Sequence, residues 1–338
     1  YFLLELVCYK LYAKRYTLDL SLILMKPYND YNSYLRAKYG CKVYRIGLDA
    51  GFSCPNRDLT KGTQGCVYCN IAGSRASYAN PNDPVAKQLR DRIDYLKKIK
   101  TSGKFIAYFQ AFTNTYAPAD KLKTIYDVIL PFKEVIGLSI GTRPDAIDRR
   151  KMRLISSYKD SYEVWIEYGL QSIHDRTLKL INRGHGFKEF LDAFNITKEF
   201  GVSVCAHIIL GLPGESRDDM MATAARLSEM KIDGIKLHLL HILKGSILEK
   251  WYCDGKVKPL KQDEYVELVC DFLENLSRDI IIQRLTGQGS RIDHIAPSWA
   301  LDKTGTIRRI GEELERRGSR QGAKVKTGQT SFSSLFSV

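Results

Sequence analysis

Six short runs of apolar and β-branched residues recur along the chain, and a longer amphipathic stretch follows each of them. The runs are mostly continuous rather than alternating, which is typical of parallel strands covered on both faces. They span residues 43–50, 105–110, 135–141, 163–169, 202–210 and 234–242. This order of elements restricts the chain to an α/β fold built on a parallel sheet.

The amphipathic stretches between these runs are predicted helices. They cover residues 84–100, 119–131, 145–157, 174–182, 187–200 and 216–230. Six β-then-α units with right-handed crossovers fit an open doubly wound sheet or a partial (β/α) barrel, and element order alone does not separate the two. In both folds the chemistry gathers on loops at the C-terminal ends of the strands.

The C-terminal third continues with a predicted helix at 262–278, a strand at 280–285 and a helix at 305–317. We interpret these as an α/β extension over residues 246–318, following a main unit over residues 30–245. The last stretch, 319–338, is polar and basic and contains no acids, so it is predicted to be a disordered tail.

The first 24 residues hold two apolar runs split by basic side chains, and neither run approaches the length of a membrane span. They also lack the order of a signal peptide. We expect residues 1–24 to be a non-native or leader segment, with Met25 as the native start. The missing secretion signal predicts a reducing, cytoplasmic compartment, where clustered cysteines bind metal or perform redox work more often than they form disulfides.

The chain of 338 residues carries a formal net charge of +14 and has a pI of about 9.3. Such an excess of Lys and Arg favours a polyanionic partner such as nucleic acid, although many basic enzymes share it. Charge therefore suggests a class of partner without identifying one.

Three of the eight cysteines, Cys54, Cys66 and Cys69, lie in the loop directly after the first predicted strand. A fourth ligand such as Cys41 or a histidine would complete a structural zinc site, but no second CxxC pair is present. In a second interpretation the three cysteines are ordinary buried residues, although a polar, Gly-rich loop is a poor place to bury thiols. In the third reading, three thiolates hold a [4Fe-4S] cluster whose fourth iron stays open for a ligand.

The loop LDAGFSCPNRDLTKGTQGCVYCN, residues 48–70, resembles the cluster-binding loop of radical SAM enzymes. Its cysteines are separated by eleven and then two residues. This spacing resembles the branch named for the bacterial proteins YhcC and YtqA, which is related to the catalytic subunit of Elongator. Tyr68 fills the aromatic position before the last cysteine. The resemblance covers about residues 30–320 and implies a partial (β/α)6 barrel.

Four later segments also resemble this family in its order, at residues 105–118, 136–148, 166–185 and 207–216. They correspond to the strand ends that hold S-adenosylmethionine (SAM) in relatives, and His207 stands where some relatives carry an acid that binds the ribose. The resemblance implies Cys54, Cys66 and Cys69 as cluster ligands. The cofactor-binding positions that it implies are Tyr68, Gln110, Ala111, Thr142, Gln171, Arg183, His207 and Gly211.

The function implied by the resemblance is reductive cleavage of SAM to a 5′-deoxyadenosyl radical, with electrons from a donor such as flavodoxin or ferredoxin. Related enzymes point to a tRNA substrate, modified at the side chain of the wobble uridine, and the basic composition agrees. Two alternatives stay open. One is a radical SAM enzyme for a small molecule such as a porphyrin precursor, and the other is a zinc-stabilised RNA-binding module without catalysis.

Overall fold

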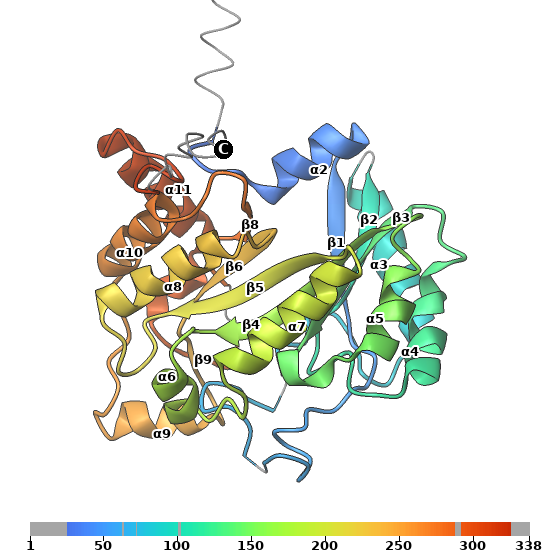
Figure 1. Cartoon of the computed structure of the whole chain (residues 1–338), viewed down its shortest axis with the longest axis horizontal. Coiled ribbons are helices and arrows are strands. Elements are labelled where there is room, and N and C mark those ends of the chain that lie inside the picture. The colour runs from blue at the N-terminus through green and yellow to red at the C-terminus, as the bar shows by residue number, and fades with distance from the viewer. Residues whose placement is uncertain (1–25, 63, 72, 101–102, 288–291, 326–338) are drawn as a thin grey trace, which may run out of the picture.

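A computed structural model describes residues 26–62, 64–71, 73–100, 103–287 and 292–325. Seven parallel strands form one curled sheet, a partial barrel, in the order β1-β2-β3-β4-β5-β6-β8 (Figure 1). The strands are β1 (Val43–Leu48), β2 (Lys104–Phe109), β3 (Val135–Thr142), β4 (Glu163–Gln171), β5 (Ser203–Leu210), β6 (Gly234–Leu239) and β8 (Ile281–Arg284). The predicted α/β partial barrel is confirmed, with one strand more than the six that were expected.

Helices cover the outer face of this sheet (Figure 1). They are α3 (Val85–Ile99), α4 (Ala119–Tyr126), α5 (Arg149–Ser156), α7 (Phe187–Glu199) and α8 (Arg217–Glu229). Helix α6 (Asp175–Leu180) lies apart from them (Figure 1), and its Leu178 joins a second apolar cluster with Val67 and Leu248. Single 3-10 turns, Asp127–Ile129 and Pro144–Ala146, adjoin α4 and α5. Apolar residues between sheet and helices, such as Leu89, Phe109 and Ile166, are wholly buried and form the main core. This burial explains why the strands read as continuous apolar runs.

The predicted C-terminal extension is not a separate layer. Its strand β8 pairs in parallel with β6 and becomes the seventh strand of the barrel sheet. Around it lie α9 (Ile247–Cys253), α10 (Gln262–Glu274), the turn Ser298–Leu301 and α11 (Lys303–Arg316), and α10 packs against both α8 and α11. A two-stranded sheet of β7 (Ile242–Leu243) and β9 (His294–Ala296), with α9, had no counterpart in the sequence patterns.

The predicted tail at 319–338 begins too early. Gln321 is buried, and its amide donates hydrogen bonds to the carbonyls of Ser277 (2.6 Å) and Ile280 (2.9 Å). Its side-chain oxygen accepts one from the Asn29 N–H (2.9 Å). The packed chain therefore continues past 319, whereas residues 326–338 and the predicted leader lie outside the described residues.

Helix α2 (Tyr31–Tyr39) closes the N-terminal end of the barrel. Asp30 caps it by accepting hydrogen bonds from the N–H groups of Asn32 and Ser33. Tyr31 packs edge-on against Trp165, with ring centroids 5.7 Å apart, and Leu35 joins the same cluster. These apolar side chains, here called the apolar plug, fill the interior of the barrel at the N-terminal end of the strands. The open space therefore lies at the opposite, C-terminal end of the strands.

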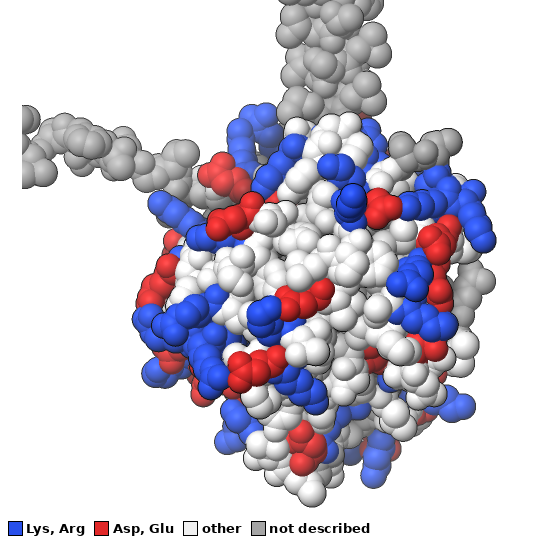
Figure 2. Space-filling view, turned by 90° about the vertical axis from the view of Figure 1, so that its right-hand side faces the viewer, with Lys and Arg blue, Asp and Glu red and all other residues white. Residues whose placement is uncertain are grey.

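The outer face over α3, α4 and α5 carries Lys and Arg interspersed with Asp and Glu (Figure 2). Several of these charges form ion pairs: Lys87 with Asp83 and Asp91, Lys97 with Glu134, Lys123 with Asp127, and Arg150 with Asp120. The net positive charge of the chain therefore does not form a continuous basic surface on this face. Among the described residues, no helix is both long and apolar enough to cross a membrane.

Replacing Leu35 by Ala should lower the free energy of unfolding by about 2–5 kcal/mol, because a cavity would open in the plug under the barrel. Urea unfolding followed by circular dichroism measures the change. Leu130→Ala is the matched control, since Leu130 is 53% exposed, and it should cost about 0.5 kcal/mol or less. Equal losses in both variants would show that α2 does not stabilise the barrel.

Candidate functional site

The loop after β1 folds tightly enough to bring its cysteines to the mouth of the barrel. The Cys69 N–H donates to the Cys66 carbonyl (3.0 Å), so these two residues share one turn. Gly65 takes a positive φ of 73°, and a Cβ there would lie 2.7 Å from Nε of Arg57. A larger residue at position 65 would therefore push Arg57 away from the loop.

Side-chain hydrogen bonds fix this loop to its neighbours. Arg57 donates to the carbonyls of Cys69 (2.9 Å) and Asn70 (2.6 Å). Asn56 donates to the Asn182 carbonyl (2.7 Å), and Asn182 donates in return to the Gly65 carbonyl (2.7 Å). The cysteine loop is thus held to the segment after α6 by a reciprocal pair of amides.

The Cys66 sulfur is surrounded by donors. Arg183 Nη1 lies 3.5 Å and Asn56 Nδ2 lies 3.6 Å from its Sγ. Burial alone would raise the pKa of the Cys66 thiol. The Arg183 and Arg143 guanidiniums nevertheless hold this pKa below the ordinary thiol value. Burial raises the pKa of Cys69 to about 11. Donors directed at a buried sulfur are the surroundings that a metal-bound thiolate requires.

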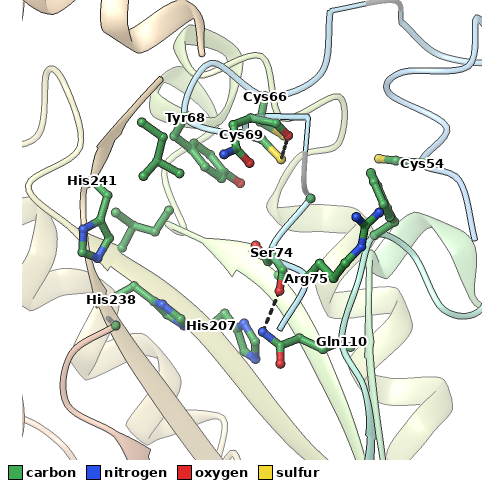
Figure 3. A pocket seen from close by; sticks show the side chains of 18 of the residues that line it. Cys54, Cys66, Tyr68, Cys69, Ser74, Arg75, Gln110, His207, His238 and His241 are labelled. Carbon is green, nitrogen blue, oxygen red and sulfur yellow. Dashed lines mark hydrogen bonds between the residues drawn. The ribbon is translucent and has the colours of Figure 1, made fainter. Parts of the chain in front are cut away.

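A cavity of about 580 Å³ opens beside these sulfurs at the C-terminal ends of the strands. It is lined by all three cysteines and by Tyr68, Gln110, Thr142, Gln171, Arg183 and His207 among the implied cofactor positions. Figure 3 shows Cys66 and Cys69 together on one side of it, across from Gln110 and His207. The structure therefore brings together residues from the first loop and from β2, β3, β4 and β5.

Two implied positions lie outside the cavity lining. Ala111 is wholly buried behind it, and Gly211 lies against the Leu260 side chain. Both Gln110 and Ala111 follow the end of β2, where the chain leaves the sheet, and the Gln110 side chain lines the cavity while Ala111 does not. The family segments cover both residues and do not distinguish which of them faces the cavity.

The backbone at the end of β4 is shaped around Arg183. A Cβ at Gly169 would lie 2.7 Å from Arg183 Nη2 and 2.9 Å from Gln171 Nε2. Arg183 Nε donates a hydrogen bond to the Gly169 carbonyl (3.0 Å). Gln171 has a positive φ of 80°, at the point where the pairing of β4 with β5 shifts register. Such a conformation is rare outside glycine, and it marks this strand end as a candidate site.

Below the cavity lies a buried cluster of charged side chains, Glu167, Arg45, Lys236 and His207, here called the Glu167 cluster. The Glu167 carboxylate pairs with Arg45 on one oxygen and with Lys236 on the other. His207 Nε2 also donates to it (2.9 Å). Burial alone would raise the pKa of the Glu167 carboxyl. The neighbouring cations Arg45 and Lys236 nevertheless hold this pKa well below its ordinary value.

Apart from His207, sequence reasoning missed the members of the Glu167 cluster, and it also missed three further lining residues, His238, His241 and Arg284. A signal was available, because each charged residue of the cluster interrupts an otherwise apolar run: Arg45 in VYRIGL, Glu167 in EVWIEYGL and Lys236 in GIKLHLL. A charge in a strand covered on both faces must be paired inside the protein or serve a ligand.

Within the described part of the chain, no three His, Cys, Asp or Glu side chains are placed to share a single metal ion. Figure 3 shows Cys54 apart from Cys66 and Cys69. What the cysteine loop offers is three thiols around the end of a cavity, with hydrogen-bond donors at the buried sulfur.

Comparison with known proteins adds to this geometry. A family model described as the radical SAM superfamily matches residues 59–227, and one for a radical SAM C-terminal domain matches residues 232–316. The protein YtqA of Bacillus subtilis (strain 168) is 42% identical over 297 residues, which are 88% of this chain and 92% of YtqA. The resemblance to the branch named partly for YtqA is thereby confirmed.

Two more distant similarities concern other proteins. The tRNA uridine(34) acetyltransferase of Dehalococcoides mccartyi (strain CBDB1) is 30% identical over 139 residues, 40% of this chain and 30% of that protein. A solved structure of Methanocaldococcus infernus Elp3 with residues 1–46 deleted superimposes with a TM-score of 0.61 at 18% identity. That match covers 82% of this chain and 64% of the solved one, and it shows a shared fold alone.

Replacing Glu167 by Gln should lower the free energy of unfolding by about 3–5 kcal/mol, because Arg45 and Lys236 would stay buried without their carboxylate. Since the pKa of Glu167 is depressed in the folded state, its stabilisation is present above the ordinary value of 4.5 and is lost as the pH falls below it. The difference between wild type and variant should therefore shrink in acid, which urea unfolding at several pH values measures.

The control is Glu229→Gln, which removes a carboxylate paired with Arg226 on the exposed surface of α8. It should change stability by about 1 kcal/mol or less. The assigned role of Glu167 would be contradicted if Glu167→Gln lost no more free energy of unfolding than this control. It would also be contradicted if the loss stayed constant down to acid pH.

Proposed function

This chain belongs to the radical SAM superfamily, and from that premise we propose that Cys54, Cys66 and Cys69 hold a [4Fe-4S] cluster beside a SAM site in the cavity. The observation that carries the proposal is the shared location of the three cysteines and six of the eight implied SAM positions around one cavity. Members of this superfamily are enzymes that use both cofactors.

When bound, the cluster supplies one electron, received from a donor such as flavodoxin or ferredoxin, for cleavage of SAM to methionine and a 5′-deoxyadenosyl radical. Arg183 and Asn56 stabilise the Cys66 thiolate by hydrogen bonds, and Arg57 fixes the turn that carries Cys69. SAM and the substrate, once bound, would displace water from the cavity around the reacting groups. This chemistry suits a reducing compartment such as the cytoplasm.

The remaining implied residues receive positioning roles in the proposal. Gln110, Thr142 and Gln171 come from three successive strand ends and would orient SAM along the cavity wall. The Thr142 hydroxyl is already fixed by the hydroxyl of Thr115 (2.6 Å), which limits its rotation. Ala111 and Gly211 are retained only as backbone positions of the segments that follow β2 and β5.

Tyr68 and His207 mark the two ends of this proposed SAM site. Tyr68 lies between the two cysteines of the CxxC turn, and His207 lies on the cavity floor. Some relatives carry a ribose-binding acid at the position of His207. Here the carboxylate comes from Glu167 on the neighbouring strand, hydrogen-bonded to His207.

We further propose a tRNA substrate, modified at the side chain of the wobble uridine. The similarity of residues in this chain to a tRNA uridine(34) acetyltransferase and the net charge of +14 support it. The tRNA would approach the cavity mouth, because the charges over α3, α4 and α5 are largely neutralised by ion pairs. A small-molecule substrate such as a porphyrin precursor is the alternative, and the enclosed cavity would also suit it.

Cys66→Ala should lose both the iron–sulfur cluster and SAM cleavage, because it removes one of three thiolate ligands. The measurements are iron and sulfide content after anaerobic reconstitution and formation of 5′-deoxyadenosine after reduction. Cys253→Ala is the control, since Cys253 is exposed on α9 and should be dispensable. Retention of cluster and cleavage by Cys66→Ala would refute the ligand assignment.

Deletion of the gene should remove or alter one modified uridine in bulk tRNA, seen by mass spectrometry of tRNA nucleosides. The wild-type gene should restore it, and the Cys66→Ala gene should not. An unchanged nucleoside profile, with SAM cleavage intact in the purified enzyme, would favour the small-molecule alternative.

A further inference from the structure

Arg284 ends the last strand of the sheet and faces the cavity. It lies in register with Lys236 on the adjacent strand β6. Within the described part of the chain, its guanidinium has no hydrogen bond and no ion pair. Burial lowers the pKa of Arg284 below the ordinary arginine value. The Glu167 carboxylate attracts it but is already paired with Arg45 and Lys236. A buried guanidinium with no carboxylate paired to it is costly unless a ligand binds it.

The charges around Arg284 do not balance. The single carboxylate of the Glu167 cluster already pairs with Arg45 and Lys236 and accepts a hydrogen bond from His207. Burial and the Arg45 guanidinium lower the pKa of Lys236 to about 7 despite the Glu167 carboxylate. The Glu167 carboxylate alone cannot pair all of these cations, and the other carboxylate of the cavity lining, Asp293, lies 3.5 Å from the Asn70 amide instead.

Lys303, at the start of α11, adds to this excess. Burial and then the Arg284 guanidinium lower its pKa, so the two cationic groups lie within electrostatic reach of each other. The same guanidinium depresses the pKa of His238 and of His241. The whole β6–β8 side of the cavity is consequently a region that attracts negative charge.

Two histidines supply neutral donors beside Arg284. Nε2 of His238 and both ring nitrogens of His241 are buried without a hydrogen-bond partner among the described residues. Both side chains line the cavity, as Figure 3 shows, and burial keeps their pKa low, about 4 for His241, so the rings are neutral at pH 7. Each neutral imidazole can donate one N–H to a ligand.

This region is separate from the cysteines in electrostatic terms. Beside the cysteines, Arg183 Nη1 lies 3.5 Å from the Cys66 sulfur, and Arg57 donates a hydrogen bond to the Cys69 carbonyl (2.9 Å). Arg284 instead acts on the histidines and on Lys236. The cavity thus has one set of cations near the cysteines and a second set near Arg284.

We propose that Arg284, with His238 and His241, binds an oxyanion of the substrate, a carboxylate or a phosphate, on the β6–β8 side of the cavity. The guanidinium offers two parallel N–H donors, which match the oxygens of either group, and the imidazoles supply one more each. The inference rests on the proposed function, because it assumes that the substrate shares this cavity with SAM.

The test uses the full chain with reconstituted cluster and with SAM bound, titrated calorimetrically with acetate and with inorganic phosphate at constant ionic strength. The wild type should bind one of the two, and Arg284→Gln should weaken that binding about tenfold or more, because a charge-assisted bidentate contact is lost. Arg284→Lys should retain part of it. Arg226→Gln, on the exposed surface of α8, should bind like the wild type.

Acetate binding alone assigns a carboxylate, and phosphate binding alone assigns a phosphate. Binding of neither probe by the wild type, or equal binding by Arg284→Gln, would overturn the proposal. A second measurement is thermal unfolding, in which Arg284→Gln should melt at or above the wild-type temperature, because an unpaired cation has been removed. A marked fall in melting temperature would instead indicate a structural role and would overturn the proposal.

SAM cleavage separates this proposal from the proposed function. If Arg284→Gln still holds its cluster and cleaves SAM but has lost anion binding, the anion belongs to the substrate side, as proposed. If the variant loses cluster or cleavage, Arg284 serves the cofactors and the oxyanion proposal fails. Failure of the wild type to cleave SAM would count against the proposed function, whatever the anion titration shows.

Discussion

The carboxylate of Glu167 is the interaction on which the interior of the barrel depends. It projects from β4 and binds Arg45 of β1, His207 of β5 and Lys236 of β6, so one buried anion connects strands on both sides of the sheet's centre. Below it the plug under α2 is apolar, and above it the cavity is open. The Glu167 cluster therefore forms the boundary between the part of the barrel that stabilises the fold and the part that binds ligands.

Much of the fold could be predicted because its strands are covered on both faces, which gives each a local apolar signature of the correct length. What could not be predicted depends on distant pairing. Residues 280–285 read as a strand, but only β6 shows that this strand completes the barrel sheet. Likewise, the polar stretch around Gln321 appears disordered until the carbonyls of Ser277 and Ile280 are seen to accept its amide.

The candidate site shows a similar division. The three cysteines and their spacing are local, so the sequence sufficed to identify the loop. Which of Gln110 and Ala111 faces the cavity depends on the path of the chain after β2 ends at Phe109, and the family resemblance covered both residues equally. Arg284, His238 and His241 lie far from the cysteines in sequence, and only the curl of the sheet brings them to the same cavity.

The two sets of cations in the cavity differ in what can balance them. Arg183 lies 3.5 Å from the Cys66 sulfur and Arg143 pairs with Asp145. Arg284 and Lys303, in contrast, have no ion pair among the described residues, and the Glu167 carboxylate that attracts Arg284 is already paired with Arg45 and Lys236. A neutral ligand would leave this second set uncompensated in a region shielded from water, where electrostatic interactions are strong. A ligand with one anionic end gains most when that end lies beside Arg284, and its other end then lies in the remainder of the cavity, which the cysteines also line. The same cations that are left without paired carboxylates would thus orient the substrate for reaction.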